Sequence, residues 1–334
     1  MITVLNLPVA SKKKPWQIEI SKAKLSLQEL LDYCQLPMDK SFIDHSDFVI
    51  KATPNYLSCI EKGNPKDPLL LQVLPSIEEN EIVEGFSNDP LQEKNQNPQA
   101  SIVHKYNNRI LVVATGSCAI HCRYCFRRHF PYEQNRHSSK QWLKTIEYLQ
   151  KHPEVDELIF SGGDPLSLAD STLRLMINDL ETISSIKTIR FHSRIPVVLP
   201  SRIDQDFLNV FKACTKKMIM VIHSNHANEL NLPVKQACQT LHNHKFTLLN
   251  QSVLLKSIND DHITLIELSH RLFDCNVLPY YLHLLDKVQG AAHFDIPIEQ
   301  AKQIYSQIQA NLSGYLVPKL ALEEPNESNK TLII

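Results

Sequence analysis

Short β-prone runs alternate with helix-length segments from residue 110 onward in this 334-residue chain. Strands that alternate with helices predict right-handed βαβ units and a parallel sheet. A closed barrel of this type needs eight strands, whereas only six runs are present. We therefore predict an α/β fold with a partial, open (βα)₆ TIM-like barrel, and a doubly wound sheet is the alternative. The six runs are ILVVAT (110–115), ELIFS (157–161), KTIRFH (187–192), MIMVIH (218–223), FTLLNQ (246–251) and VLPYYLHL (277–284).

A polar cluster follows each of these runs directly. Because the carboxyl ends of parallel strands meet at one edge of the sheet, ligand sites gather there in both candidate folds. The functional site is therefore expected at this edge. The clusters are GSCAIHCRYC, GGDP, SRIP, SNHANE, SVLLK and LDKVQG.

The first hundred residues differ from the rest in composition and hydrophobic pattern, and they predict a mainly helical N-terminal extension. Residues 26–36 begin with a capping box of Ser26 and Glu29 and place apolar residues on one helical face. Residues 63–100 are rich in Pro, Asn and Glu, which is typical of short helical pieces joined by turns. We therefore divide the chain into an extension (1–100), a core barrel (101–320) and a C-terminal segment (321–334).

The charge balance excludes some classes of partner. The net charge is −1, which gives no general reason to expect nucleic-acid or membrane-surface binding. The N-terminus carries no apolar segment typical of a secretory signal, and no run approaches the roughly 20 apolar residues of a spanning helix. A cytoplasmic location is expected.

Three of the eight cysteines are clustered, in the pattern C-x₃-C-x₂-C. In a cytoplasmic chain such a cluster favours metal ligation over a disulfide framework. A four-iron cube normally takes four thiolates, so three would leave one iron open to a ligand. A structural zinc site completed by His121 or His129 is the alternative, although no second short-spaced pair is present. The clustered residues are Cys118, Cys122 and Cys125; the scattered ones, expected in the core, are Cys34, Cys59, Cys214, Cys238 and Cys275.

The cysteine spacing after a strand, with Tyr124 before the third cysteine, resembles the radical S-adenosylmethionine (radical SAM) superfamily. The resemblance implies a [4Fe-4S] cluster whose open iron binds S-adenosylmethionine (SAM) and cleaves it to a 5′-deoxyadenosyl radical. It also implies that FSGGDPL (160–166) surrounds SAM, because glycine permits close backbone approach. The residues expected around SAM are Gly162, Gly163, Asp164, His223 and Gln251, with Asn225 as a further candidate; the strand-end residues among them could equally serve as loop caps.

Further motifs narrow the resemblance to the lysine 2,3-aminomutase family, over residues 104–331. They are CRYCFRRHF, SGGDPL, RIPVVLP, HSNHANEL, NQSVLL, PYYLHLLD and SGYLVP. The short chain, HKYNNR and FRRHFPY are most similar to the members that make (R)-β-lysine for modification of elongation factor P.

The family implies a second cofactor, pyridoxal 5′-phosphate (PLP), held as a Schiff base on a lysine near the C-terminus. Lys330 stands at that position, with Lys319 as the nearest alternative. Larger family members have a glycine-rich run before this lysine, whereas residues 326–329 here read NESN. Lys105 or Arg194 could hold the cofactor phosphate, and the sequence alone does not separate them.

The resemblance also places residues at both ends of an amino-acid substrate. Arg127 aligns with the arginine that pairs with the α-carboxylate, and its alternative is a surface arginine. Asp286 and Glu323 align with two carboxylates that bind the distal ammonium, although the second is usually aspartate. Two acids favour a cationic side chain and would repel glutamate.

We therefore predict a PLP-dependent radical SAM isomerase that converts L-lysine to β-lysine. The implied partners are L-lysine, an electron donor of unknown identity, and, through the product, elongation factor P and its lysyl ligase; a homo-oligomer is compatible with the sequence. A radical SAM aminomutase of another amino acid, such as glutamate, and a zinc-stabilised binding protein are the alternatives.

Overall fold

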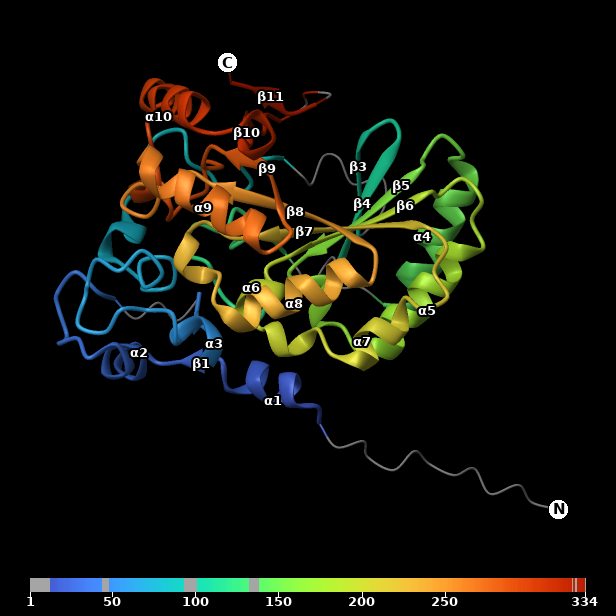
Figure 1. Ribbon diagram of the computed structural model, residues 1–334, viewed down its shortest axis with the longest axis horizontal. Helices are drawn as coiled ribbons and strands as arrows, with labels where there is room; N and C mark the ends of the chain where they lie inside the picture. The colour runs from blue at the N-terminus through green and yellow to red at the C-terminus, as the bar shows by residue number, and fades with distance from the viewer. Residues whose placement is uncertain are drawn as a thin grey trace.

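A nine-stranded sheet forms the centre of the computed structural model, which describes residues 13–43, 48–92, 101–131, 138–325, 327 and 329–333 (Figure 1). Its strand order is β11-β10-β9-β8-β7-β6-β5-β4-β3. The six predicted runs form β4 to β9, and each pairs in parallel with the next. Because the order follows the sequence without a reversal, the partial (βα)₆ barrel is confirmed and the doubly wound sheet is excluded. These strands are β4 (Arg109–Thr115), β5 (Glu157–Gly162), β6 (Thr188–Ser193), β7 (Lys217–His223), β8 (Phe246–Val253) and β9 (Leu278–His283).

Helices in the connections cover the outside of the sheet, as βαβ units require (Figure 1). Most bury one apolar face; Leu173, Met176, Ile177 and Leu180 do so in α5, for example. The helices are α4 (Ser139–Lys151), α5 (Asp170–Glu181), α6 (Ile195–Val198), α7 (Gln205–Val210), α8 (Leu232–Asn243), α9 (His262–Asp274) and α10 (Ile298–Asn311).

Three strands outside the six predicted runs lie at the two edges of the sheet, and of these only the strand around Lys319 was expected. β3 (Ile102–Tyr106) pairs antiparallel with β4 at one edge. At the other edge β10 (Lys319–Leu322) pairs in parallel with β9, and β11 (Thr331–Leu332) pairs antiparallel with β10. Each is short, so its local pattern is weak, and its pairing depends on the strands already in place.

The described part of the extension contains short helices and turns packed on one side of the barrel. The predicted amphipathic helix is α2 (Leu27–Cys34), capped by Ser26 and Glu29 as expected, with Leu27, Leu30, Leu31 and Cys34 buried. A two-stranded ladder of β1 and β2 was not predicted. The expected boundary near residue 100 lies next to 93–100, outside the described residues. The other elements are α1 (Pro15–Lys22), β1 (Lys24–Leu25), β2 (Ile50–Lys51), α3 (Pro54–Leu57) and a 3₁₀ turn (Ile77–Asn80).

One continuous hydrophobic core joins the extension to the barrel. It runs from Trp16 and Leu30 in the extension to Phe160 and Phe191 on β5 and β6, whose rings stack. The extension is therefore packed as a cover on the barrel.

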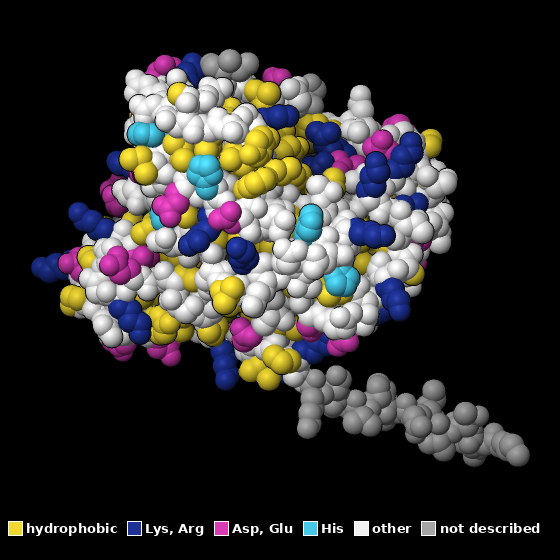
Figure 2. Space-filling model, viewed as in Figure 1, with side chains coloured by type: hydrophobic (Ala, Val, Ile, Leu, Met, Phe, Trp, Pro, Cys, Tyr) yellow, Lys and Arg dark blue, Asp and Glu magenta, His cyan; other side chains and the backbone are white. Residues whose placement is uncertain are grey.

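Among the described residues, no helix has the length and apolar character needed to span a bilayer. The face in Figure 2 carries basic and acidic side chains, and its hydrophobic side chains gather near β9 and β10.

Candidate active site

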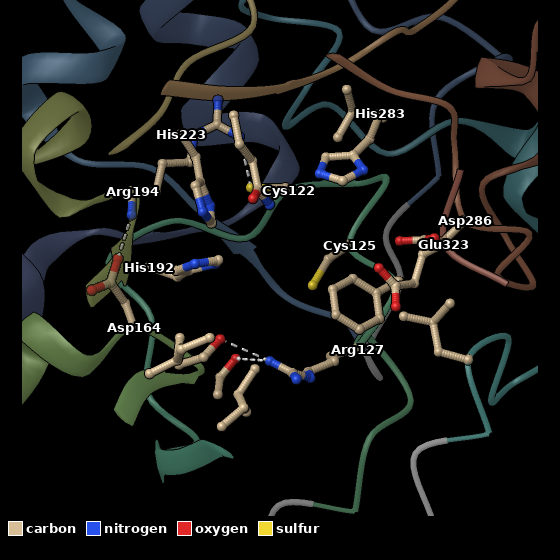
Figure 3. A pocket seen from close by; sticks show the side chains of 18 of the residues that line it. Cys122, Cys125, Arg127, Asp164, His192, Arg194, His223, His283, Asp286 and Glu323 are labelled. Carbon is tan, nitrogen blue, oxygen red and sulfur yellow. Dashed lines mark hydrogen bonds between the residues drawn. The ribbon is translucent and has the colours of Figure 1, made fainter. Parts of the chain in front are cut away.

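A cavity of about 640 Å³ lies at the carboxyl ends of β4 to β9, where the polar clusters predicted it. Figure 3 labels ten of its lining residues, whose side chains surround one open space. Every predicted site residue lines this cavity, although these residues come from many separate segments between residues 118 and 330. The twelve are Cys118, Cys122, Cys125, Arg127, Gly162, Gly163, Asp164, His223, Gln251, Asp286, Glu323 and Lys330.

The cysteine loop follows β4 and is braced by the glycine turn that follows β5. The backbone N–H of Gly163 donates to the Thr115 carbonyl (2.6 Å), and that of Asp164 donates to the Ser117 carbonyl (2.7 Å). A Cβ on Gly163 would lie 2.5 Å from the Ser117 oxygen, and Gly162 has φ +115°. We expected these glycines to admit SAM. The structure adds a second reason, because no larger residue fits against the cysteine loop.

The extension holds the same loop from the opposite side through a buried ion pair. The Arg123 Nε donates to Glu79 Oε1 (2.7 Å), and Arg128 Nη2 donates to Glu79 Oε2 (2.6 Å). Burial opposes ionisation of Glu79, but the hydrogen bonds and charges of the two arginines lower its pKa. The Arg123 N–H also bonds the Gln72 carbonyl (2.9 Å). The loop conformation therefore depends on residues far earlier in the chain.

The three cysteines are better suited to bind a metal cluster than to exist as separate, unbound thiolates. Burial and the neighbouring Cys122 thiolate raise the pKa of Cys125 to about 11. Burial also raises the pKa of Cys118, and the charges of the other two cysteines add to the effect. Several thiolates side by side therefore need bound cations to offset their repulsion, as iron supplies in a cluster.

The histidines of the zinc alternative are engaged elsewhere. His121 Nδ1 bonds the Val49 carbonyl (2.9 Å), and its ring stacks on Phe48. His129 Nε2 bonds the Gln289 carbonyl (3.1 Å). In the part of the chain that the structure describes, no group of three His, Cys, Asp or Glu side chains is placed to hold one metal ion.

Asp164 joins the turn after β5 to the turn after β6. Its buried carboxylate accepts from Ser193 Oγ (2.7 Å) and from the backbone N–H groups of Leu166 (3.1 Å), Arg194 (2.8 Å) and Ile195 (3.0 Å). Burial raises its pKa to about 6, although these hydrogen bonds oppose the rise. Because protein donors already surround the carboxylate, its contact with SAM stays a prediction.

Three histidines present buried, unpartnered Nε2 atoms among the described residues and line the cavity: His192, His223 and His283. Burial lowers the pKa of all three; for His223 the charges of Arg194 and Arg127 assist, and the pKa falls to about 3. The rings are therefore neutral, and each can donate or accept one hydrogen bond to a ligand. Asn225, by contrast, bonds Tyr124 and Gln72 and accepts from the Val253 N–H, so its side chain is committed to the protein.

The opposite end of the cavity holds a cluster of charges around Glu323. Its carboxylate accepts from Lys105 Nζ (2.6 Å), Tyr106 Oη (3.1 Å) and Lys330 Nζ. Burial opposes ionisation, but the Lys330 charge and the hydrogen bonds from both lysines lower the Glu323 pKa to about 2. Lys105 and Tyr106 belong to β3, whereas Glu323 follows β10. Side chains therefore bridge the two edges of the open sheet.

The structure allows two predictions to be compared with their alternatives: Arg127 with a surface arginine, and Lys330 with Lys319. Arg127 is 5% exposed and donates to Ser161 Oγ (3.1 Å) and to the Gly162 carbonyl (3.4 Å), so it is not a surface arginine. Lys319 is exposed on β10 and does not line the cavity, whereas Lys330 does.

Several cavity residues were missed by the sequence analysis. Arg190 and His192 on β6, and Tyr281 and His283 on β9, line the cavity. On β6 the signal was present: these two polar residues alternate with buried Ile189 and Phe191 in a strand of the predicted parallel sheet. Polar residues at every second position of such a strand indicate the barrel interior.

Comparison with known proteins decides the family. Residues 112–268 match the profile of the radical SAM superfamily. The chain is 47% identical to the L-lysine 2,3-aminomutase of Haemophilus influenzae over 328 residues. This alignment covers 97% of each of the two chains. The chain belongs to the lysine 2,3-aminomutase family. It is also similar to the enzymes of that name from Escherichia coli (44% identity, 99% of this chain and 96% of that one) and Clostridium subterminale (32%, 96% and 77%).

Membership of the family makes this chain a radical SAM enzyme, so the non-catalytic zinc protein is no longer a candidate. The superfamily implies a [4Fe-4S] cluster and SAM, and the cavity fits both. Cys118, Cys122 and Cys125 supply thiol ligands, and the unpartnered histidine nitrogens offer hydrogen bonds to a polar ligand nearby.

Proposed function

We propose that the enzyme converts L-lysine to β-lysine, with PLP carried on Lys330. The observation that supports this proposal most directly is the placement of Lys330, Asp286 and Glu323 in the same cavity as the cysteine loop. Arg127 lies between these groups and the turn after β5, which it contacts through Gly162. One cavity therefore offers a cation for an α-carboxylate and two anions for a distal ammonium.

The charge of the cavity supports lysine over glutamate. Glu323 is 12% exposed at its side chain, and its pKa of about 2 keeps it ionised at neutral pH. A substrate carboxylate placed near it would meet a buried like charge, which costs free energy, whereas an ammonium would gain a charge-assisted hydrogen bond. The family alignment of Asp286 with the first of the two carboxylates adds to the same preference.

PLP fits the Lys330 end of the cavity. Lys330 Nζ lies 5.6 Å from the centre of the Tyr281 ring and pairs with Glu323. Of the two candidates for the phosphate, Lys105 lies beside Glu323, whereas the Arg194 guanidinium contacts Cys122, Gln72 and Glu229. We therefore assign the phosphate to Lys105.

In this proposal Glu323 pairs first with Lys330 and later with the substrate ammonium. A carboxylate whose pKa is about 2 pairs with the Lys330 ammonium and does not remove its proton. To hold PLP as a Schiff base, Lys330 would have to leave this pair as the neutral amine. One oxygen of Glu323 would then be available for the substrate ammonium.

The residues of the chain bind and orient, and the cofactors supply the chemistry. When bound, the cluster and SAM provide a radical that removes hydrogen, and PLP provides the π-system through which an amino group moves between adjacent carbons. Arg127 and the two carboxylates fix both ends of the amino acid. The carbon that reacts is thereby held at a set distance from the cysteine loop.

Product analysis tests the substrate. The anaerobically reconstituted enzyme, supplied with SAM, PLP and dithionite, is incubated with L-lysine or with L-glutamate, and the amino acids are separated by chromatography. We expect β-lysine from lysine and no β-glutamate. Turnover of glutamate with lysine inert would contradict the proposal.

We further propose that the product is (R)-β-lysine and is attached to elongation factor P by its lysyl ligase. The similarity of HKYNNR and FRRHFPY to members with that role supports this proposal. The mass of elongation factor P from cells with and without the gene tests it. We expect the mass to decrease by one β-lysyl group when the gene is deleted and to recover on complementation, and an unchanged mass would exclude the role.

A further inference from the structure

A buried arginine contacts one of the cluster cysteines. Arg194, directly after β6, is 6% exposed, and its Nη1 donates to Cys122 Sγ at 2.8 Å and also contacts the Tyr124 hydroxyl. Its Nη2 donates to Gln72 Oε1 (2.7 Å) and to Glu229 Oε2 (3.0 Å). The guanidinium therefore lies between a thiol that the family assigns to iron and a buried carboxylate.

Both members of this ion pair are held by the backbone around them. The Asp164 carboxylate accepts the N–H of Arg194 (2.8 Å), and Asp164 is itself bonded to the cysteine loop through its own N–H. Glu229 is 1% exposed, and its Oε1 accepts from the N–H groups of Asn225 (2.8 Å) and His226 (3.1 Å). Neither side chain can turn away without breaking several buried hydrogen bonds.

We infer that Arg194 and Glu229 together set the reduction midpoint potential of the cluster, with Arg194 as a positioning residue for Cys122. A one-electron reduction by an external donor adds one negative charge to the cluster. A cation that donates an N–H···S hydrogen bond stabilises the more negative, reduced state and so raises the potential. Glu229 offsets part of that cation, and burial strengthens both effects because the local dielectric is low.

This inference depends on the cluster that the superfamily implies and is independent of the amino acid that the enzyme rearranges. A lysine- and a glutamate-specific enzyme would show the same potential shifts. Failure of the product assay above would therefore leave the inference intact, and the reverse also holds.

The test is an EPR-monitored redox titration of anaerobically reconstituted protein, matched for iron and sulfide. In Glu229→Gln, the side-chain oxygen that accepts from Asn225 and His226 remains while the charge is lost, so the potential should rise. In the double variant Arg194→Met/Glu229→Gln, the buried pair and the N–H···S bond are removed together, so the potential should fall. We expect at least a tenfold change in the reduction equilibrium in each, which is 59 mV for one electron.

Two further variants separate a local electrostatic effect from general disturbance. Arg194→Lys keeps the charge but loses the planar fork, so its potential should lie between those of the wild type and the double variant. The control is Arg202→Met/Asp170→Asn, which removes another pair of a buried arginine and a partly buried carboxylate, neither of which lines the cavity. Its potential should match the wild type.

Two results would overturn the inference. One is a Glu229→Gln potential at or below that of the wild type. The other is an equal shift in the Arg202 control. If the double variant does not incorporate iron, Glu229→Gln and Arg194→Lys still decide the matter, because each keeps a hydrogen-bonding side chain in place.

Discussion

The two ends of the cavity are built in different ways. At the cysteine end, backbone hydrogen bonds join the loop after β4 to the turn after β5, and the buried Arg194–Glu229 pair lies against Cys122. At the lysine end, Glu323 gathers Lys105 and Lys330 from the two edges of the sheet, and the Lys330 side chain is 27% exposed.

The difference indicates which end is formed before any ligand binds. Backbone bonds and buried side chains fix the cysteine end, because no ligand can replace them without exposing unpaired polar groups. The lysine end is held by ion pairs, and an incoming phosphate or ammonium can take the place of either partner. We therefore expect changes at one end to leave the binding function of the other end largely intact.

The largest effect is expected from a variant that loses the cluster at the cysteine end and keeps the lysine end. Cys118→Ser should lose iron, sulfide and turnover, because one of three ligands is removed. It should still bind PLP, which the absorbance of the imine measures. Cys214→Ser is the matched control, since Cys214 is half-buried outside the cavity and should keep its iron. Unchanged iron and turnover in Cys118→Ser would refute the cluster assignment.

The reciprocal change removes the lysine end. Lys330→Ala should abolish the PLP imine and turnover while iron and sulfide stay at wild-type levels, as colorimetric quantitation can show. Lys319→Ala, an exposed neighbour on β10, should behave as the wild type. If Lys319→Ala loses the imine and Lys330→Ala keeps it, the assignment of the PLP lysine is wrong.

A smaller effect is expected when one charge at the lysine end is neutralised. Glu323→Gln keeps the shape of the side chain but loses a charge-assisted bond of about 1.5–3 kcal/mol, so KM for lysine should rise on the order of 10- to 100-fold. The imine should form faster, because Lys330 no longer pairs with a carboxylate. Steady-state kinetics and stopped-flow absorbance measure the two effects. Glu324→Gln should change KM little, because the Glu324 side chain bonds Thr331 outside the cavity lining.

The smallest expected effect concerns the stability of the neutral histidines. His223 has a folded pKa of about 3, so the unfolded chain binds its proton at a higher pH than the folded chain does. Stability should therefore fall as the pH drops below about 6.5, by about 2 kcal/mol from this histidine between about pH 7.5 and about pH 5.

Urea unfolding at those two pH values measures this change. His223→Asn should lose less stability on acidification than the wild type does. The exposed His270 on α9 supplies the control, because solvent reaches it in both states, and His270→Asn should follow the wild type. A wild-type pH dependence in His223→Asn would show that folding does not lower the pKa of this ring.

The sequence by itself determined the parts of this protein whose signals are local. Hydrophobic periodicity located β4 to β9 and α2, and the cysteine spacing and the glycine turn marked the site, because each signal lies within a few consecutive residues. The rule that parallel strands end at a common edge predicted where the polar clusters meet, whereas Arg127, Glu323 and Lys330 were named from the family resemblance alone.

Only the tertiary structure decided how the barrel is closed and which polar groups are already committed. Lys105 and Glu323 are 218 residues apart, and their contact depends on the curvature of the whole sheet, which no local pattern records. Asp164 and Asn225 carry the residue types of cofactor ligands, yet protein donors and acceptors surround their side chains. Arg194 lies against Cys122 because the turns after β5 and β6 bond each other, and pairing between strands arises only after the chain has folded.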